Sequence, residues 1–194
     1  MSHELRKAGT GPLPVTLRLY RRLSAAAAPL TPALFKRRLG QGKEDPARID
    51  ERRGITRHAR PSGPLVWIHG ASVGEVLAAA ALIERLRALN IRILLTSGTV
   101  TSAAVVAKRF PPDIIHQYLP YDSPRFVARF LNYWQPSLAL FIESDLWPNL
   151  ILAGAARRLP MVLINGRMSH RSFPRWRRVS GTIAALLGRF DICL

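Results

Sequence analysis

Short apolar runs alternate with amphipathic helical patterns from Pro64 to the end of the chain. The runs are rich in Val, Ile, Leu and Phe, which is typical of β-strands. They begin about 23 to 30 residues apart, close to the length of a strand–helix–strand unit. The predicted strands are LVWIH (65–69), IRILLT (91–96), IIHQYL (114–119), SLALFI (137–142), MVLIN (161–165) and FDICL (190–194). The predicted helices between them cover residues 73–89, 101–110, 123–134, 147–158 and 175–188.

This alternation predicts an α/β protein with a doubly wound, mostly parallel sheet, because continuous apolar runs are typical of strands covered by helices on both faces. Ligands of such sheets bind outside the carboxyl ends of the strands. We therefore expect the functional side chains in the loops that follow the strands. These loops hold small and polar residues, acidic clusters and an arginine, which suits a hydroxylated, charged ligand. The five loops are residues 70–72, 97–99, 120–122, 143–145 and 165–167.

The residues before the sheet pattern form two further segments. Residues 1–39 are basic and apolar, and we interpret them as a membrane-associating segment with an amphipathic helix. A disordered basic tail and an amphipathic helix packed on the domain remain open as alternatives. Residues 40–63 are charged and are expected to be a connector, followed by the α/β domain at 64–194. A membrane span and a signal peptide are disfavoured because arginines and prolines interrupt the apolar stretch: Arg18, Arg21, Arg22, Pro29 and Pro32.

The composition adds a strong positive charge to this picture. The chain has 29 Lys and Arg against 12 Asp and Glu, a formal net charge of +17. Such a surface attracts phosphates on nucleic acid, lipid or substrate. Apolar residues make up 48% of the chain, which excludes a disordered protein, and the single Cys193 excludes an internal disulfide.

Several nucleotide and metal motifs are missing from the sequence. The first turn reads Gly70-x-x-x-Gly74 rather than G-x-G-x-x-G, and no P-loop is present. The five histidines show no metal-ligand spacing, so no metal site is predicted. We interpret His69 and His116, which lie near strand ends, as satisfied core or rim histidines.

Ser72 and Glu75 precede an apolar helical pattern at the spacing of a capping box. In that interpretation the serine accepts from one backbone N–H and the glutamate from another. Gly74 between them does not fit a purely structural role, because glycine inside a helix is unfavourable by up to about 1 kcal/mol relative to alanine. It leaves the backbone N–H groups open to a ligand, and a carboxylate beside them can accept a proton from a hydroxyl. The local sequence leaves helix cap and catalyst equally open.

A second acidic pair, Glu143 and Asp145, ends the predicted strand 137–142, and Pro148 suits the first turn of the next helix. The two acids either complement the positive end of that helix or direct a carboxylate at a ligand. We favour the second interpretation.

Four motifs in order on successive strand ends, HGASVGE, YLPYDSP, ESDLWPN and NGRMSHRS, resemble the N-terminal domain of the 3-deoxy-D-manno-octulosonic acid (Kdo) transferases of lipopolysaccharide biosynthesis. The upstream GKEDPARIDERRG resembles the connector of that family. The resemblance implies the Rossmann-like N-terminal half of a glycosyltransferase with the two-domain GT-B architecture. It also implies transfer of Kdo from CMP-Kdo to a hydroxyl of a lipid A precursor, at the cytoplasmic face of the cell inner membrane.

The resemblance also assigns roles to residues. Glu75 falls on the glutamate taken as the general base, and Glu143 on the acid that stabilises the transition state or organises the acceptor site. We expect the acceptor to be bound by the small and polar strand-end residues Ser72, Gly74, Asp145, Asn165 and Arg167. An inverting displacement needs a base on the acceptor face and charge stabilisation opposite it. No cofactor is expected, since CMP-Kdo is the donor substrate. The expected partners are the lipid A precursor and the anionic membrane surface, and not nucleic acid.

The family continues into a second domain that carries the CMP-sugar site, whereas this sequence stops after FDICL. We therefore expect the chain as written to bind acceptor and membrane and not to turn over alone. Two other functions remain open. A basic nucleic-acid-binding module is suggested by the arginines and aromatics of residues 171–190, and an inactive membrane-associated Rossmann domain by the missing donor half.

Overall fold

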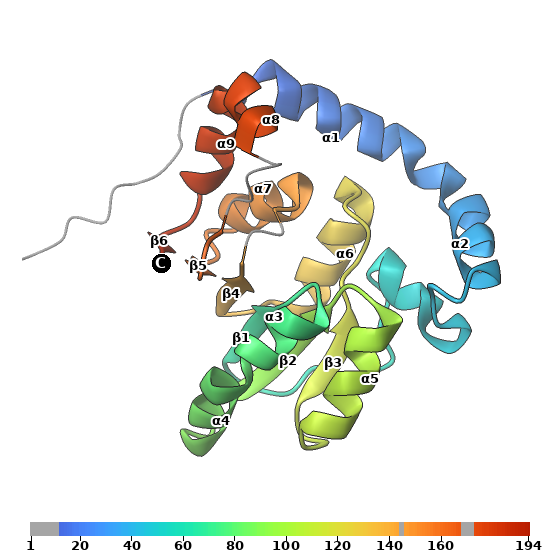
Figure 1. Ribbon diagram of the computed structural model, residues 1–194, viewed down its shortest axis with the longest axis vertical. Helices are drawn as coiled ribbons and strands as arrows, with labels where there is room; N and C mark the ends of the chain where they lie inside the picture. The colour runs from blue at the N-terminus through green and yellow to red at the C-terminus, as the bar shows by residue number, and fades with distance from the viewer. Residues whose placement is uncertain (1–11, 144–145, 168–172) are drawn as a thin grey trace, which may run out of the picture.

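Parallel strands form the centre of the molecule (Figure 1). The structure, a computed structural model, describes residues 12–143, 146–167 and 173–194. Within these residues six strands pair in the order β3-β2-β1-β4-β5-β6, and every pair is parallel. This is the strand order of doubly wound sheets, so the predicted fold class is confirmed. The strands are β1 Leu65–His69, β2 Arg92–Ser97, β3 Ile115–Tyr118, β4 Leu138–Ile142, β5 Met161–Ile164 and β6 Ile192–Cys193.

Helices cover both faces of the sheet (Figure 1). Successive side chains of a strand point to opposite faces, and β1 shows this directly. Leu65 and Trp67 pack in the core beneath α6, α7 and α9, whereas Val66 and Ile68 pack in a second core beneath α3, α4 and α5. Both cores are apolar, which explains why the strands read as continuous apolar runs. These helices are α3 Val73–Ala78, α4 Ala80–Ala88, α5 Val100–Arg109, α6 Pro124–Trp134, α7 Pro148–Ala156 and α9 Ser180–Leu187.

Two of the predicted helices are divided in the structure. The predicted helix 73–89 becomes α3 and α4, with a turn at Ala79. The Ala79 N–H still donates to the Glu75 carbonyl, and the Ala79 carbonyl accepts from Ile83, so the two pieces continue one another. The predicted helix 175–188 likewise becomes α8 (Phe173–Arg178) and α9, with a turn at Val179.

The N-terminal residues form a helical arm, residues 12–40, that arches over α7 and α6 in Figure 1. It consists of α1 (Val15–Ala27), the short 3₁₀ helix η1 (Ala28–Leu30) and α2 (Thr31–Gly40). Leu17 and Phe35 are buried, whereas other large apolar side chains of the arm are exposed. Among the described residues, no helix is both long and apolar enough to cross a membrane. The exposed apolar side chains of the arm are Val15, Leu19, Tyr20, Leu23, Leu30 and Leu34.

Residues 40–63, interpreted from the sequence as a connector, include the 3₁₀ helix η2 (Pro46–Arg53), which packs along β3 and α6. Asp45 caps η2 by accepting from the Ala47 N–H at 2.9 Å. Gly54 ends it with a φ of 74°, and a Cβ at Gly54 would lie 2.3 Å from the Phe126 carbonyl oxygen. Only glycine fits both this backbone conformation and this close approach. The end of η2 is therefore packed tightly against α6.

Candidate active site at the carboxyl ends of the strands

The strand order reverses between β1 and β4. The chain runs outward from β1 to β2 and β3 and then returns to the other side of β1 as β4. At this switch point His69 and Phe141 are register partners at the carboxyl ends of their strands. Ligands of doubly wound sheets bind at such a point. Glu75 lies in the first turn of α3, which follows β1, and Glu143 directly follows β4. The two carboxylates singled out from the sequence therefore lie in the loops on either side of the switch point.

Ser72 and Glu75 form a modified capping arrangement. The Ser72 Oγ accepts from the Glu75 N–H at 3.3 Å, as in a capping box. The Glu75 carboxylate, however, accepts through Oε2 from the N–H of Ala71 at 2.7 Å, one residue before the helix cap. Among the described residues this is the only hydrogen bond of the Glu75 side chain. One carboxylate oxygen is thus fixed to the β1–α3 loop, and Oε1 makes no such bond.

Two glycines bring the loops after β1 and β2 together. A Cβ at Gly70 would lie 3.0 Å from the Val76 nitrogen, so Gly70 lets α3 approach the end of β1. A Cβ at Gly98 would lie 2.7 Å from the Ala71 carbonyl oxygen, which itself accepts from the Gly98 N–H at 3.0 Å. Gly74 differs from both, because a Cβ there would meet only the Ser72 Oγ, at 3.9 Å. Packing therefore does not require glycine at position 74, which is exposed.

Glu143 and Asn165 end adjacent strands with the same unusual backbone. Their φ angles are 60° and 56°, in the left-handed region that residues other than glycine rarely adopt. The Glu143 N–H donates to the Ile164 carbonyl at 2.8 Å, which ties the ends of β4 and β5 together. Left-handed backbone at a residue other than glycine is unfavourable by roughly 1 kcal/mol or more, and it clusters at functional sites. The strain makes this pair of loops a candidate part of the site.

Of the three remaining predicted acceptor residues, two contact each other. Asn165 and Arg167 are exposed, and the Arg167 Nε donates to the Asn165 Oδ1 at 3.3 Å. The structure thus joins these two to each other, and it gives neither a contact with Glu75. Asp145 lies outside the described residues.

The two histidines considered in the sequence, His69 at the end of β1 and His116 within β3, are both hydrogen bonded. The buried His69 places Nδ1 2.9 Å from the Thr96 Oγ1. His116 places Nε2 2.9 Å from the Ser97 Oγ and Nδ1 3.1 Å from the Arg48 Nη2. Within the described ranges, no group of three or more His, Cys, Asp or Glu side chains is arranged to hold a metal ion.

Asp122, in the loop after β3, has a structural role that the sequence analysis did not assign. Its carboxylate accepts from the N–H groups of Asn149 and Leu150, both at 2.9 Å, and from the Tyr20 hydroxyl at 2.9 Å. Burial raises the pKa of the Asp122 carboxyl, and these hydrogen bonds oppose that rise. Asp122 therefore caps α7 from another loop and holds the arm onto the domain.

Two ion pairs that hold η2 were also not predicted from the sequence: one is buried, and in the other the arginine is half-buried. Arg52 pairs with Glu44 at 2.8 Å, and Arg48 pairs with Glu51 at 2.9 Å. Charged residues in a polar stretch predict an exposed segment, so hydrophobic patterning gives no sign of these pairs. Glu51 follows Arg48 by three residues, a spacing that brings two side chains together on a helix, whereas Glu44 precedes Arg52 by eight residues and gives no such hint.

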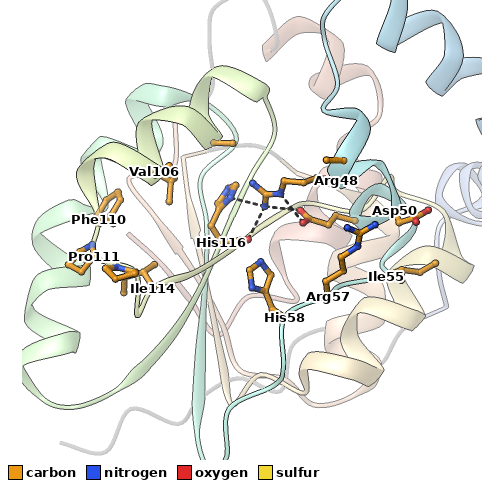
Figure 2. Close-up of a pocket in the computed structure, with 15 residues that line it drawn as sticks. Arg48, Asp50, Ile55, Arg57, His58, Val106, Phe110, Pro111, Ile114 and His116 are labelled. Atoms are coloured by element: carbon orange, nitrogen blue, oxygen red, sulfur yellow. Dashed lines mark hydrogen bonds and ion pairs between the residues drawn. The ribbon is translucent and has the colours of Figure 1, made fainter.

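A cavity of about 660 Å³ lies beside η2 (Figure 2). It is lined by η2, the residues after it, α5 and β3, with Arg48 and His116 side by side as Figure 2 shows. β3 is separated from β1 by β2, so this cavity lies along the sheet edge rather than at the switch point. Because it lies away from the switch point and the Arg48–Glu51 pair in its lining is already satisfied, it is not the candidate site.

The sheet order, the doubly wound helices and the polar loops around the β1–β4 switch point define a Rossmann-like α/β domain. Comparison with known proteins then gives the family. Residues 47–194 match the family described as 3-Deoxy-D-manno-octulosonic-acid transferase (kdotransferase). The chain belongs to this family.

Individual relatives agree with the family match. The chain is 36% identical over 179 residues to a probable mitochondrial 3-deoxy-D-manno-octulosonic acid transferase of Arabidopsis thaliana, which covers 90% of the chain and 40% of the relative. It is 39% identical over 177 residues to the 3-deoxy-D-manno-octulosonic acid transferase of Rickettsia bellii, covering 90% and 42%. The corresponding protein of Haemophilus influenzae is 35% identical over 148 residues, covering 75% and 35%. The chain thus spans about two fifths of the length of these relatives.

Proposed function

We propose that this chain is the acceptor-binding part of an inverting glycosyltransferase. The transferase moves Kdo from CMP-Kdo to a hydroxyl of a lipid A precursor in lipopolysaccharide biosynthesis. Family membership supports the Kdo transferase activity. The observation that carries the mechanism is the Glu75 carboxylate, held by the Ala71 N–H in the loop after β1.

In this mechanism Glu75 is the general base. Its Oε2 is fixed by the Ala71 N–H, so Oε1 faces the acceptor hydroxyl and accepts its proton. The hydroxyl oxygen bonds to the anomeric carbon of Kdo as the bond from that carbon to the CMP phosphate oxygen breaks. Fixing the carboxylate in advance lowers the barrier, because no reorganisation is needed during the reaction.

Glu143, in the loop after β4, is the second proposed catalytic residue and lies on the other side of the switch point. Its strained backbone, tied to β5 through Ile164, sets the direction of the carboxylate. We assign it to stabilising the positive charge that develops on the sugar ring, or to ordering the acceptor. The exposed Ser72, Gly74, Asn165 and Arg167 are the proposed acceptor contacts, together with Asp145.

The donor and the location follow from the same proposal. CMP-Kdo binds to a second, C-terminal domain in a two-domain GT-B enzyme, so the part described here supplies the acceptor side. No cofactor takes part. The exposed apolar and basic side chains of the arm contact anionic headgroups at the cytoplasmic face of the inner membrane, where each Lys or Arg contributes about 1 kcal/mol.

Glu75→Gln in the intact protein tests this function. Glutamine keeps an oxygen for the Ala71 N–H but cannot act as a base. We expect Kdo transfer from CMP-Kdo to a lipid A precursor to fall by about 100-fold or more in kcat, with Tm within a few degrees of the parent. The matched control is Glu84→Gln, an exposed glutamate of α4 paired with Arg109, which should leave kcat unchanged. Full activity of the Glu75 variant would show that Glu75 is only a helix cap.

A further inference from the structure

The buried guanidinium of Arg52 is connected to the proposed base, Glu75, by three successive hydrogen bonds through Gly98 and Ala71. Its Nη2 donates to the Gly98 carbonyl at 2.7 Å. The Gly98 N–H donates to the Ala71 carbonyl at 3.0 Å, and the Ala71 N–H donates to the Glu75 Oε2 at 2.7 Å. We propose that Arg52 is a positioning residue for catalysis, which fixes the Glu75 carboxylate through the loops at Gly98 and Ala71. This inference rests on the proposed role of Glu75 as base.

Arg52 is built to hold several groups at once. It is 4% exposed and uses three nitrogens in three directions. Nε donates to the Glu44 Oε2 at 2.8 Å, Nη1 donates to the Leu119 carbonyl at 3.2 Å, and Nη2 reaches Gly98. The guanidinium also lies 4.5 Å from the centre of the Tyr118 ring. A planar fork of fixed donors can join the loops after β2 and β3, whereas a lysine ammonium cannot reach all three acceptors.

The contact between Gly98 and Ala71 passes this constraint on to the loop after β1. The backbones approach so closely that a Cβ at Gly98 would lie 2.7 Å from the Ala71 oxygen. Ala71 therefore has its carbonyl held by Gly98 and its N–H held by Glu75. A shift of Gly98 moves the peptide that fixes the base. Small misplacements of a catalytic group are sufficient to lower kcat strongly, even when they begin far from the chemistry.

Glu44 completes the arrangement on the other side of Arg52. Its Oε1 accepts from the Arg38 Nε of α2 at 2.7 Å and from the Tyr121 hydroxyl at 2.9 Å. Burial alone would raise the pKa of Glu44, but the charge and hydrogen bonds of Arg52 and Arg38 hold it below its usual value. Glu44 thus stays ionised and keeps Arg52 in place.

Arg48 provides a matched control within the same short helix. It also pairs with a buried glutamate, Glu51, and its Nη2 also donates to a backbone carbonyl, that of His116. Those contacts lead to β3, where Glu51 accepts from the Tyr118 N–H, and through the His116 ring to the Ser97 Oγ at the end of β2. Arg48 donates no hydrogen bond to Gly98 or Ala71, whereas Arg52 donates directly to the Gly98 carbonyl. Lysine at either position therefore removes a planar fork of donors that pairs with a glutamate, but only lysine at 52 removes the hydrogen bond to the Gly98 carbonyl.

The test is a double-mutant cycle in the intact protein. Arg52→Lys and Arg48→Lys are each made alone and with Glu75→Gln, and kcat and KM of Kdo transfer are measured with Tm. We expect Arg52→Lys to lower kcat about tenfold with KM changed less than twofold, and this loss to disappear in the Glu75→Gln background. Arg48→Lys should also lower Tm and should leave kcat within twofold.

The outcomes separate this inference from the proposed function. If Glu75→Gln is inactive but the Arg52→Lys loss is equally large in that background, Arg52 does not act through Glu75 and the inference is wrong. The same holds if Arg48→Lys lowers kcat as much. If Glu75→Gln is fully active, the proposed function fails, and the inference fails with it.

A second variant and a second measurement protect the test against misfolding. Glu44→Gln weakens the hold on Arg52 without changing the fork, and we expect a kcat loss of about threefold with the same dependence on Glu75. Hydrogen exchange at the amides of Ala71 and Gly98 should become faster in Arg52→Lys and Glu44→Gln but not in Arg48→Lys. Unchanged exchange at both amides would overturn the inference.

Discussion

The Nδ1 atom of His116 accepts a hydrogen bond from the Arg48 guanidinium, 3.1 Å away. Because a guanidinium only donates, Nδ1 must be unprotonated, and the proton of the neutral ring lies on Nε2 facing the Ser97 Oγ. Protonation would place two cations in contact in a buried site. Burial, with the charges of Arg48, His58 and Arg52, lowers the pKa of His116 from 6.5 to about 3.

This histidine should make the protein less stable in mild acid. The lowered pKa means that His116 favours the folded state above pH 6.5, and that this contribution is lost as the pH falls from 6.5 towards 3. Between pH 7 and pH 5 we expect a loss of about 2 kcal/mol in the free energy of unfolding, measured by denaturant titration. His116→Gln should reduce the loss. The same change at the exposed His58 is the control, and equal pH dependence in both variants would contradict the assignment.

Asp122→Asn should destabilise the protein by about 2 to 3 kcal/mol. The carboxylate accepts from the N–H groups of Asn149 and Leu150 with different oxygens. In asparagine an NH₂ group replaces one oxygen and faces one of these donors. Tyr20→Phe, which removes only the hydroxyl bonded to Asp122, should lower stability by about 1 kcal/mol. Thermal unfolding compares the two, and equal effects would mean that the cap of α7 contributes nothing.

Two glycine substitutions near the site should act in opposite directions. Gly98→Ala places a Cβ 2.7 Å from the Ala71 oxygen and should destabilise the protein by 1 kcal/mol or more, by the order of magnitude of an overpacked site. Gly74→Ala meets only the Ser72 Oγ at 3.9 Å and should stabilise α3 by up to about 1 kcal/mol. If Gly74 leaves room for the acceptor, its alanine variant should also raise KM for the acceptor severalfold. An unchanged KM would remove Gly74 from the acceptor site.

The exposed stripe of α1 should carry membrane binding. Val15, Leu19 and Leu23 are 68%, 54% and 60% exposed and follow one another at four-residue spacing, so they share one side of the helix. We expect Leu19→Asp combined with Leu23→Asp to reduce cosedimentation with vesicles of anionic phospholipid about tenfold. Leu89→Asp, at an equally exposed leucine that follows α4, is the control.

The effects of salt and of competing DNA on vesicle binding test which anionic partner the basic arm binds. Vesicle binding should weaken as salt rises, because the lysines and arginines contribute through charge. If the Leu19→Asp, Leu23→Asp variant binds vesicles as well as the parent, the arm does not contact the membrane. If double-stranded DNA displaces the protein from the vesicles at physiological salt, the nucleic-acid-binding alternative is favoured instead.

The sheet was predictable because its signal is local and strong. Strands covered on both faces must be apolar along their whole length, as Trp67 and Ile68 illustrate by packing in opposite cores. The ends of the helices were less predictable. The turn at Ala79 interrupts a continuous amphipathic pattern without a proline or glycine to mark it.

The candidate site was predictable only in outline. The rule that ligands bind at carboxyl ends placed Glu75 and Glu143 at the same edge of the sheet, and the observed strand order makes their loops neighbours. The partner of Glu75 was not predictable, since a capping box places the bond on the Ser72 N–H and the structure places it on Ala71. Arg52 was missed because its burial depends on acceptors far away in the sequence, at Gly98 and Leu119.

The two oxygens of Glu44 have a consequence for the arm. One is held by Arg38 of α2 and the other by Arg52 of η2, and Glu44 itself is 5% exposed. Detaching α2 would remove one of the three partners of a buried carboxylate, which is unfavourable by about 1 to 3 kcal/mol. The arm is therefore preorganised. Any anionic surface that binds the arm would meet helices that are already formed, so little of the binding free energy would be lost to the ordering of a flexible chain.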